Sequence, residues 1–487
     1  MPAVDGSTVL VIAAFAVDFL VRIVAIIVVP RNRRPMSGMA WLLAIFFLPY
    51  VGVLLFLLIG YRTLPKKRLA QQAEINRFIL ESTEGIDLVR RDKVWPGWLQ
   101  SVVELNRNLG AMPLVGDNSA RLYGDYQGAL DAMIADIDAA ERYVHAEFYI
   151  LALDDTTAPF FDALQNAVER GVVVRVLMDH IQSMRQKGYR QTKARLTAAG
   201  VYWEVMLPVK PFEGKWQRPD LRNHRKLLIV DGAVGFMGSQ NIIDRSYNKR
   251  RNIRRGMKWK DLMTRVEGPI VSGLNAIFIT DWYSETDELL TRDVEPVYVR
   301  PVTDALDCQV VPSGPGFKGE NNLRLFLALL YYARERLIIT SPYFVPDEAM
   351  MYAITTATQR GIHVELFVSE IGDQVVVYHA QRSYYEELLR AGVHIYMFKT
   401  PYILHAKHFT IDDEVAVVGS SNMDQRSFSL NMEVSLMVRG RSFVRELRGI
   451  EDGYRADSRE LTLAEWEKQP LRSTVLDNLA RLTSAVQ

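Results

Sequence analysis

The residue pattern with the clearest chemistry occurs twice in this sequence of 487 residues. Each copy has a histidine, a lysine two residues later and an aspartate five residues after that. In such a set one imidazole can attack phosphorus, the other can protonate the departing alkoxide, and the ammonium groups can hold the phosphate oxygens. Histidine suits both tasks because its unperturbed pKa is about 6.5. The pattern therefore predicts a phosphodiester site whose chemistry needs no metal ion, with catalytic residues His224, Lys226, Asp231, His405, Lys407 and Asp412.

Each copy continues into a Gly-Ser-x-Asn segment, which we interpret as part of the same site. Small residues let backbone N–H groups and short polar side chains approach an anion. In a strand, residues two apart point to the same face, so the histidine and lysine of each copy are expected side by side ahead of an Asp-initiated turn. One copy alone would be weak evidence, and its duplication makes chance implausible. The expected phosphate-binding residues are Ser239, Asn241, Ser420 and Asn422.

Alternating helical and strand-like segments surround both copies. This alternation predicts an α/β fold with helices on both faces of a sheet. Because each half would supply half of the catalytic set, we expect two similar α/β/α halves packed with pseudo-two-fold symmetry and the site at their seam. The expected divisions are a membrane anchor over residues 1–68, a linker with a helix over 69–113, a first half over 114–300 and a second half over 301–487.

Two long apolar runs precede these halves, over residues 9–29 and 39–59. Each would form a helix of about 31 Å, enough to cross the hydrocarbon core of a membrane. Asp18 and Arg22 interrupt the first run four residues apart, so they are expected to pair on the helix. We predict two membrane helices, with a shallow pair in one leaflet, suited by Pro49, as the alternative. Basic residues follow both runs, so the orientation stays open, although the larger second cluster favours a cytoplasmic catalytic part. The first cluster is Arg31, Arg33 and Arg34, and the second is Arg62, Lys66, Lys67 and Arg68.

Composition narrows the function classes further. A net charge of +1 disfavours a protein that coats nucleic acid. Cys308 is the sole cysteine, which excludes an intrachain disulfide, and the eight histidines show no zinc-ligand spacing. Residues 249–260 hold seven basic side chains. This segment is interpreted either as an ordinary solvated face or as a contact for anionic lipid headgroups.

With both H-x-K-x4-D motifs intact, the sequence resembles the phospholipase D superfamily. In detail it resembles the bacterial cardiolipin synthases, and the resemblance runs from about residue 123 to residue 438. It implies that a carboxylate downstream of each motif orients a catalytic histidine, which assigns Asp261 and Glu433. It also implies that Asp231 and Asp412 support their hairpins rather than touch substrate. The segments that carry the closer likeness are residues 145–150, 222–226, 311–315 and 341–346.

The activity implied by this resemblance is the conversion of two phosphatidylglycerol molecules into cardiolipin and glycerol. His224 would form a phosphohistidine and His405 would act as acid and base, with the exchanged roles nearly as well supported. No cofactor is implied, and the expected location is the bacterial inner membrane. The rivals are a membrane phospholipase D that uses water, a nuclease of the same superfamily, and an inactive lipid-binding scaffold. The second lipid substrate and pairing of the chain with itself are left open.

Overall fold

The computed structural model describes residues 6–31, 33, 35–60, 64–83, 96–210, 215–290, 304–317 and 319–483. The chain forms two compact units. The N-terminal unit comprises residues 1–63 with 218–220, and the large unit comprises residues 64–217 and 221–487. Arg34, Arg62 and part of the expected 69–113 linker lie outside the described residues.

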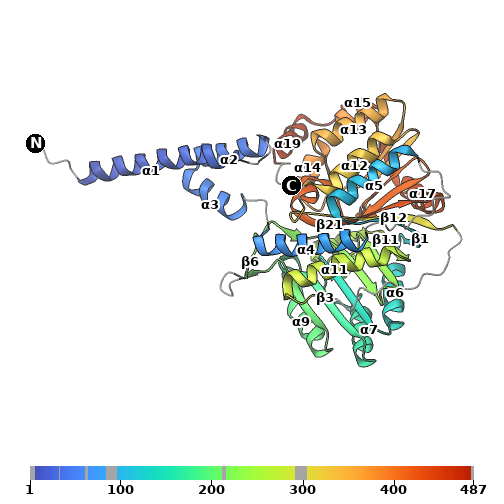
Figure 1. Cartoon of the computed structure of the whole chain (residues 1–487). Coiled ribbons are helices and arrows are strands. Elements are labelled where there is room, and N and C mark those ends of the chain that lie inside the picture. The colour runs from blue at the N-terminus through green and yellow to red at the C-terminus, as the bar shows by residue number, and fades with distance from the viewer. Residues whose placement is uncertain are drawn as a thin grey trace, which may run out of the picture. The chain divides into compact units, whose positions relative to one another are not determined.

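The N-terminal unit contains one helix that meets the length and hydropathy expected of a membrane span. Helix α1 (Gly6–Val28) carries this span over residues 9–28. The Asp18–Arg22 ion pair predicted for this helix is present, with Arg22 Nε 2.9 Å from Asp18 Oδ2. Figure 1 shows α1 as the long dark-blue helix.

The second apolar run is not the single helix that its length suggests. It forms α2 (Pro35–Phe47) and α3 (Pro49–Ile59), which pack against each other. Proline lacks an N–H group and its ring clashes with the preceding turn, so the helix ends before Pro49. A Cβ atom at Gly52 would lie 2.7 Å from the Ala44 carbonyl oxygen, so glycine permits the close approach of the two helices. At 13 and 11 residues, each helix is too short to cross a hydrocarbon core of about 30 Å.

The large unit is built on two runs of strands with the same internal order. In the first run the order is β1 (Leu114–Tyr123), β11 (Met263–Glu267), β9 (Val234–Gly238), β8 (Lys226–Val230), β2 (Tyr143–Phe148), β3 (Val173–Asp179) and β4 (Tyr202–Met206). In the second it is β12 (Leu306–Ser313), β21 (Asn431–Arg439), β19 (Val415–Gly419), β18 (His408–Ile411), β13 (Arg336–Thr340), β15 (His363–Ser369), β16 (His394–Phe398) and the additional edge strand β22 (Ser458–Leu461). Antiparallel pairing of β1 with β12 joins the runs into one sheet.

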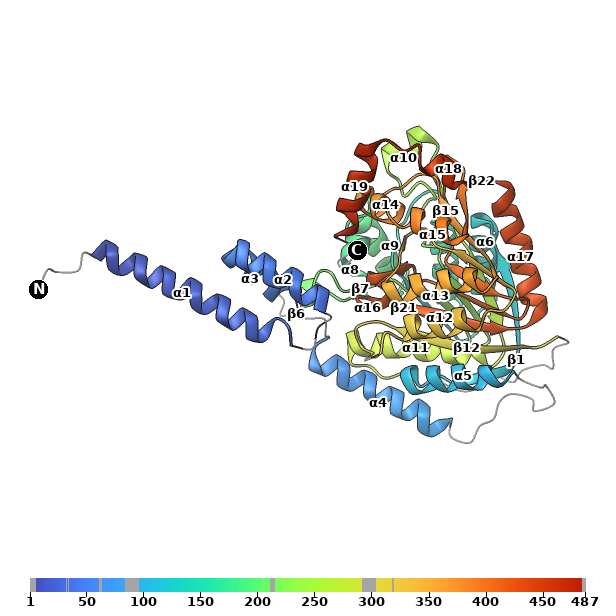
Figure 2. The ribbon, with the colours of Figure 1, turned by 90° about the horizontal axis from the view of Figure 1, so that it is seen from above.

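Helices cover both faces of each run, as the alternating pattern predicted. On one face of the first run lie α6 (Tyr126–Asp138), α7 (Ala158–Glu169) and α9 (Tyr189–Ala198), and on the other lies α11 (Ile270–Thr286). On one face of the second run lie α12 (Asn321–Tyr332), α13 (Glu348–Gln359) and α15 (Tyr385–Ala391), and on the other lies α17 (Arg441–Ala456). Figure 2 shows α17 as the long orange-red helix along one edge of the large unit.

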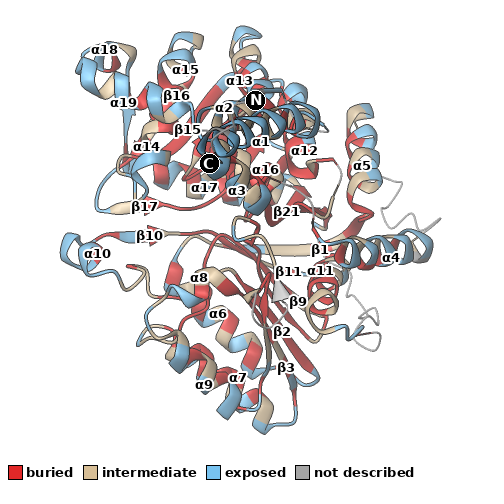
Figure 3. Cartoon of the chain, turned by 90° about the vertical axis from the view of Figure 1, so that its left-hand side faces the viewer, coloured by how far each residue is buried: buried red, intermediate tan, exposed pale blue. Residues whose placement is uncertain are grey.

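A hydrophobic core shared by both runs holds them together. It contains residues of α11 and α17 together with inward-facing residues of both sets of strands. Helix α11 contacts β12 of the second run, and α17 contacts β1 of the first. Figure 3 shows these strands as buried and the outer faces of α7, α9 and α15 as exposed. The two motifs are therefore fixed relative to each other by a common core.

Candidate active site

Each catalytic-type histidine lies at a point where the chain leaves one run of strands and pairs with the other. The short strand β7 (Arg222–Asn223) pairs with β21, and the backbone N–H of His224 donates to the Met432 carbonyl over 2.8 Å. In the same way β17 (Tyr402–Leu404) pairs with β10 (Lys258–Lys260), and the N–H of His405 donates to the Lys260 carbonyl over 2.7 Å. His224 and His405 lie before strands β8 and β18 (His408–Ile411), which begin at Lys226 and His408, so the histidine and lysine of each copy do not share one strand as expected.

The same cross-pairing brings each histidine to the carboxylate that follows the other motif. His224 Nδ1 lies 3.0 Å from both carboxylate oxygens of Glu433. His405 Nδ1 lies 2.6 Å from Asp261 Oδ1. A histidine that donates Nδ1–H to a carboxylate keeps the lone pair of Nε2 for chemistry. The predicted orienting residues therefore do contact the histidines, and each half orients the histidine of the other half.

The two lysines are buried beside the histidines. Lys226 Nζ donates to the His224 carbonyl over 2.5 Å, and Lys407 Nζ makes the same bond to His405. Burial lowers the pKa of both lysines to about 7, although Glu433 and Asp261 favour their charged forms. A bound phosphate would restore the charge on both lysines, because an opposite charge stabilises the ammonium form.

The electrostatic environments of the two histidine–carboxylate pairs differ. Burial, reinforced by Lys226 and Lys407, lowers the pKa of His224 well below its usual value, whereas the pKa of His405 falls only to about 4. Burial raises the pKa of Glu433 to about 7. Burial also acts to raise the pKa of Asp261, but His405 and neighbouring groups hold it below its usual value. The His405–Asp261 pair is therefore the better able to carry a positive imidazolium.

The serines of the two Gly-Ser-x-Asn segments bind the orienting carboxylates. The hydroxyl of Ser239 donates to Asp261 over 2.7 Å, and the hydroxyl of Ser420 donates to Glu433 over 2.5 Å. Each hydroxyl also accepts a backbone N–H, from Leu262 and Val434 respectively. The predicted role of these serines in phosphate binding gives way to a supporting role, because their hydrogen-bonding capacity is used within the protein.

Glycine precedes each serine because another backbone lies against it. A Cβ atom at Gly238 would lie 2.3 Å from the Leu262 carbonyl oxygen, and one at Gly419 would lie 2.4 Å from that of Val434.

The asparagines of the two Gly-Ser-x-Asn segments have different hydrogen-bond partners. Asn241 is engaged, accepting from the Ile150 N–H and donating to the Tyr247 hydroxyl. Asn422 Oδ1 is buried and has no hydrogen-bond partner within the described part of the chain, so this oxygen can accept a hydrogen bond from a substrate hydroxyl.

Comparison with known proteins places this geometry in a family. The family model described as "Cardiolipin synthase, PLD-like domain" matches residues 133–282 and 326–450, and a phospholipase D-nuclease N-terminal model matches residues 20–60. Cardiolipin synthase A of Proteus mirabilis is 32% identical over 456 residues, which cover 92% of each chain. The chain belongs to the cardiolipin synthase family of PLD-like proteins. Cardiolipin synthase A of Pectobacterium atrosepticum is also 32% identical, over 96% of each chain.

A solved structure supports the fold of this cardiolipin synthase family member. The crystal structure of phosphatidylserine synthase from Haemophilus influenzae matches with a TM-score of 0.60 and 14% sequence identity. The match covers 79% of this chain and 99% of that one. Because the identity is low, the likeness supports the α/β fold alone.

The aspartates of the two family motifs lie in the hairpin turns and bind backbone. Asp231, at a φ of 55°, accepts N–H groups of residues 141, 142 and 143, each over 2.8 Å. Asp412, at a φ of 49°, accepts N–H groups of residues 334, 335 and 336. Both side chains therefore fasten the hairpin to the neighbouring strand, which is the supporting role implied by the family resemblance.

We expect Asp231→Ala to lower the free energy of unfolding by about 2–4 kcal/mol, because three backbone donors lose a charged acceptor. The folded fraction should keep near-normal turnover. Chemical denaturation followed by activity measured well below the midpoint would test this. Asp131→Ala on α6, whose carboxylate accepts only from Gln127 on its own helix, is the control. A loss of turnover at unchanged stability would instead place Asp231 in the chemistry.

Three supporting contacts were not assigned from sequence. The Tyr149 ring packs edge-on against the His224 ring, with centroids 4.6 Å apart. The buried Arg225 pairs with Asp281 and donates from Nε to the Glu433 carbonyl over 3.1 Å. Asn223 donates to Glu147 over 2.6 Å. Arg225 and Asn223 lie beside His224 in the sequence, which is a signal that would have identified them as positioning residues.

The basic segment 249–260 has two parts. Its first part forms α10 (Arg250–Arg255), whose arginines and Ile253 are exposed. Its second part is β10, where Trp259 is buried and the chain continues to Asp261. The exposed basic side chains that could make the predicted contact with anionic lipid are those of α10 together with Lys249 and Lys258. Within the described ranges, no group of three or more His, Cys, Asp or Glu side chains is placed to hold a metal ion.

Proposed function

We propose that this protein is a cardiolipin synthase, which transfers a phosphatidyl group from one phosphatidylglycerol to another and releases glycerol. The observation that carries the proposal is the pair of buried histidines, each held by a carboxylate of the other half and each accompanied by a buried lysine. The proposal is supported by the family membership and by relatives that match over almost their full length and are named cardiolipin synthase A, such as the protein of Proteus mirabilis. The two halves, with matching strand order, are proposed to be related by pseudo-two-fold symmetry.

In the first step His224 Nε2 attacks phosphorus of the donor lipid. An N–P bond forms while the bond from phosphorus to the glycerol oxygen breaks, and His405 gives its Nε2 proton to that oxygen. Lys226, Lys407 and the Asn422 amide bind the non-bridging oxygens, whose charge grows in the transition state. The products of this step are a phosphatidyl-histidine and free glycerol.

In the second step a hydroxyl of the acceptor phosphatidylglycerol replaces the lost glycerol. His405, now neutral, removes the hydroxyl proton, and the oxygen attacks phosphorus as the N–P bond breaks. His224 is restored and cardiolipin is formed. The protein must favour a lipid hydroxyl over water, and a membrane surface helps by supplying that hydroxyl at high local concentration.

The assignment of roles follows from the two environments. A nucleophilic imidazole must be neutral, and His224 has the more strongly lowered pKa. An acid–base imidazole must carry a proton part of the time, and the ionised Asp261 supports that state at His405. We therefore propose His224 as the nucleophile and His405 as the general acid and base.

The N-terminal unit is proposed to anchor the protein with its large unit in the cytoplasm. If α1 spans the bilayer and the short pair α2–α3 enters only one leaflet, Arg31 and the 66–68 basic cluster fall on the same side. The conflict between the two basic clusters then disappears, and the positive-inside rule places both in the cytoplasm.

A cysteine introduced at residue 7 should react with an impermeant thiol reagent outside intact cells. Protection of this cysteine from the reagent would contradict the proposed topology. The buried Cys308 would not interfere.

The deciding experiment is a product assay on the purified full-length chain in phosphatidylglycerol vesicles. We expect equal amounts of cardiolipin and glycerol, with little phosphatidic acid. Vesicles of phosphatidylethanolamine alone are the control for non-specific headgroup release. Phosphatidic acid and glycerol without cardiolipin would instead establish the rival phospholipase D activity, and no turnover of either lipid would reject the proposal.

The lysines predict a pH dependence. With pKa values of about 7 in the free enzyme, Lys226 and Lys407 lose the charge that binds anionic phosphate as the pH rises. We expect kcat/KM for phosphatidylglycerol to fall above about pH 7, while kcat at saturating lipid falls at higher pH because bound phosphate raises both pKa values. Initial rates over pH 5–9 at constant ionic strength would test this. A kcat/KM that stays level to pH 9 would contradict it.

A further inference from the structure

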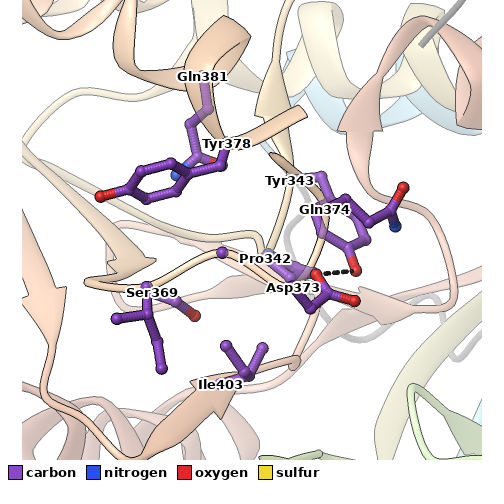
Figure 4. Close-up of a pocket in the computed structure, with 10 residues that line it drawn as sticks. Pro342, Tyr343, Ser369, Asp373, Gln374, Tyr378, Gln381 and Ile403 are labelled. Atoms are coloured by element: carbon purple, nitrogen blue, oxygen red, sulfur yellow. Dashed lines mark hydrogen bonds between the residues drawn. The ribbon is translucent and has the colours of Figure 1, made fainter. Parts of the chain in front are cut away.

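A small pocket lies against β17, the strand that leads to His405, and is not used by the mechanism above. Figure 4 shows the pocket with Ile403 and Ser369 on one side and Tyr378 and Gln381 on the other. Ile403 belongs to β17, which leads directly to His405. Ser369 exchanges hydrogen bonds with the backbone of Leu404, the residue before His405. The pocket therefore adjoins the segment that carries the proposed acid and base.

The His224 side of the site is filled at the equivalent place. In the first run Glu147 pairs with Leu227, and in the second run Thr340 pairs with His408. Leu227 and His408 each directly follow the motif lysine, so Glu147 and Thr340 occupy equivalent positions. Two residues further along come Tyr149 in the first run and Pro342 in the second. The Tyr149 ring covers His224 and lies over Lys226, whose Nζ is 5.0 Å from the ring centroid. The smaller Pro342 lines the pocket instead, so free space exists on the His405 side.

One polar group in this pocket, the Asp373 carboxylate, remains able to bind a ligand. The Tyr343 hydroxyl donates to Asp373 Oδ1 over 2.9 Å, as the dashed line in Figure 4 shows. Within the described residues, the Asp373 carboxylate makes this one hydrogen bond. Its second oxygen, Oδ2, can therefore accept a hydrogen bond from a ligand. The Gln381 amide is held within the protein, because it accepts from the Phe344 N–H and donates to the Tyr385 hydroxyl. Asp373 also contributes to the electrostatic field that favours the charged form of Lys407 and thus raises the pKa of that lysine.

We propose that Asp373 and Tyr343 form a hydroxyl-binding subsite for the glycerol headgroup of phosphatidylglycerol. The subsite holds the non-reacting hydroxyl on the middle carbon while the neighbouring primary oxygen lies at His405. This inference rests on the proposed function and deepens it by assigning the residues that select the headgroup. A carboxylate oxygen accepts a hydrogen bond from a neutral hydroxyl, so an alcohol suits the subsite better than a second anion.

One subsite serves both steps of the reaction. The glycerol that leaves in the first step and the glycerol headgroup that attacks in the second both place a primary oxygen at His405, and both carry a hydroxyl on the adjacent carbon. A carboxylate that accepts a hydrogen bond from that hydroxyl holds either one in reacting position. Water has no second hydroxyl to bind there. The subsite therefore favours transfer over hydrolysis.

The test combines a changed protein with a changed substrate. A phospholipid with a propane-1,3-diol headgroup keeps both primary oxygens and lacks the middle hydroxyl. We expect wild type to use it with a kcat/KM lower by about 10- to 100-fold, the effect of losing a hydrogen bond to a charged acceptor. Asp373→Ala should lower kcat/KM for phosphatidylglycerol by a similar factor, change the value for the diol lipid less than about 2-fold, and raise the ratio of phosphatidic acid to cardiolipin.

Two tyrosine variants provide a conservative test and its control. Tyr343→Phe removes only the hydroxyl next to Asp373, and we expect a smaller loss that is again confined to phosphatidylglycerol. Tyr378→Phe is the matched control, because its hydroxyl donates to the Glu370 carbonyl and points away from the pair in Figure 4. Equal losses with both lipids, or no loss in Asp373→Ala, would overturn the subsite. Absence of cardiolipin from wild type would instead reject the proposed function itself.

Discussion

Replacing His224 with alanine is expected to lower the rate of cardiolipin formation by at least about 10⁴-fold, because His224 is the group proposed to form the covalent intermediate. His405→Ala is expected to be equally inactive with phosphatidylglycerol, since neither the leaving glycerol nor the acceptor hydroxyl would exchange its proton. Activity with the natural lipid alone therefore cannot separate the two roles.

A substrate with a better leaving group separates them. In phosphatidyl p-nitrophenol the departing oxygen needs no proton, so His405→Ala should still release a burst of one nitrophenol per active site. The phosphatidyl-histidine should then accumulate, because its attack by an acceptor lacks a base, and mass spectrometry of peptides would locate it at residue 224. His224→Ala should give no burst. A burst from His224→Ala and none from His405→Ala would exchange the roles.

A remote histidine provides the control for these variants. His363 lies at the start of β15, is half-exposed and pairs with Glu365, and His363→Ala should keep turnover within about 2-fold of wild type. Because His224 and His405 are both buried, thermal unfolding of each variant would show whether a loss of activity comes from a loss of structure.

The α/β fold could be predicted from the sequence, because strand-like apolar runs alternate clearly with segments of helical periodicity in the large unit. In the first half, for example, residues 126–138 form the helix α6 and residues 173–179 form the buried strand β3. The second apolar run was misjudged as one helix because hydropathy counts residues and does not register that Pro49 ends a helix. The twofold relation of the halves and the domain bounds remain predictions, supported by the matching strand order.

The site was predictable in composition and only partly in connectivity. The spacing of His224, Lys226 and their counterparts predicted the reacting groups, but local spacing cannot reveal that β7 pairs with β21 and β17 with β10. Those long-range pairings decide which carboxylate meets which histidine. The roles of Ser239 and Ser420 were misjudged for the same reason, since a serine near a phosphate site and a serine behind a carboxylate have the same local sequence.

The crossed pairing leads to the second large effect. Asp261→Asn should slow cardiolipin formation by about 10²- to 10⁴-fold, because His405 loses the anion that fixes its tautomer and supports its protonated form. The nitrophenol burst should be almost unchanged, because that step does not need His405 as an acid. Glu433→Gln should impair both substrates, since Glu433 contacts His224, the proposed nucleophile.

The burst measurement discriminates between crossed and uncrossed pairing. If each carboxylate served the histidine of its own motif, Asp261 would orient His224, and Asp261→Asn would abolish the burst while Glu433→Gln preserved it. Ser239→Ala provides a graded control: it removes one hydrogen bond to Asp261 and leaves the carboxylate in place, so it should shift the transfer rate less than Asp261→Asn and leave the burst intact. The crossed contacts also make neither half sufficient alone, because each histidine depends on a carboxylate that the other half supplies.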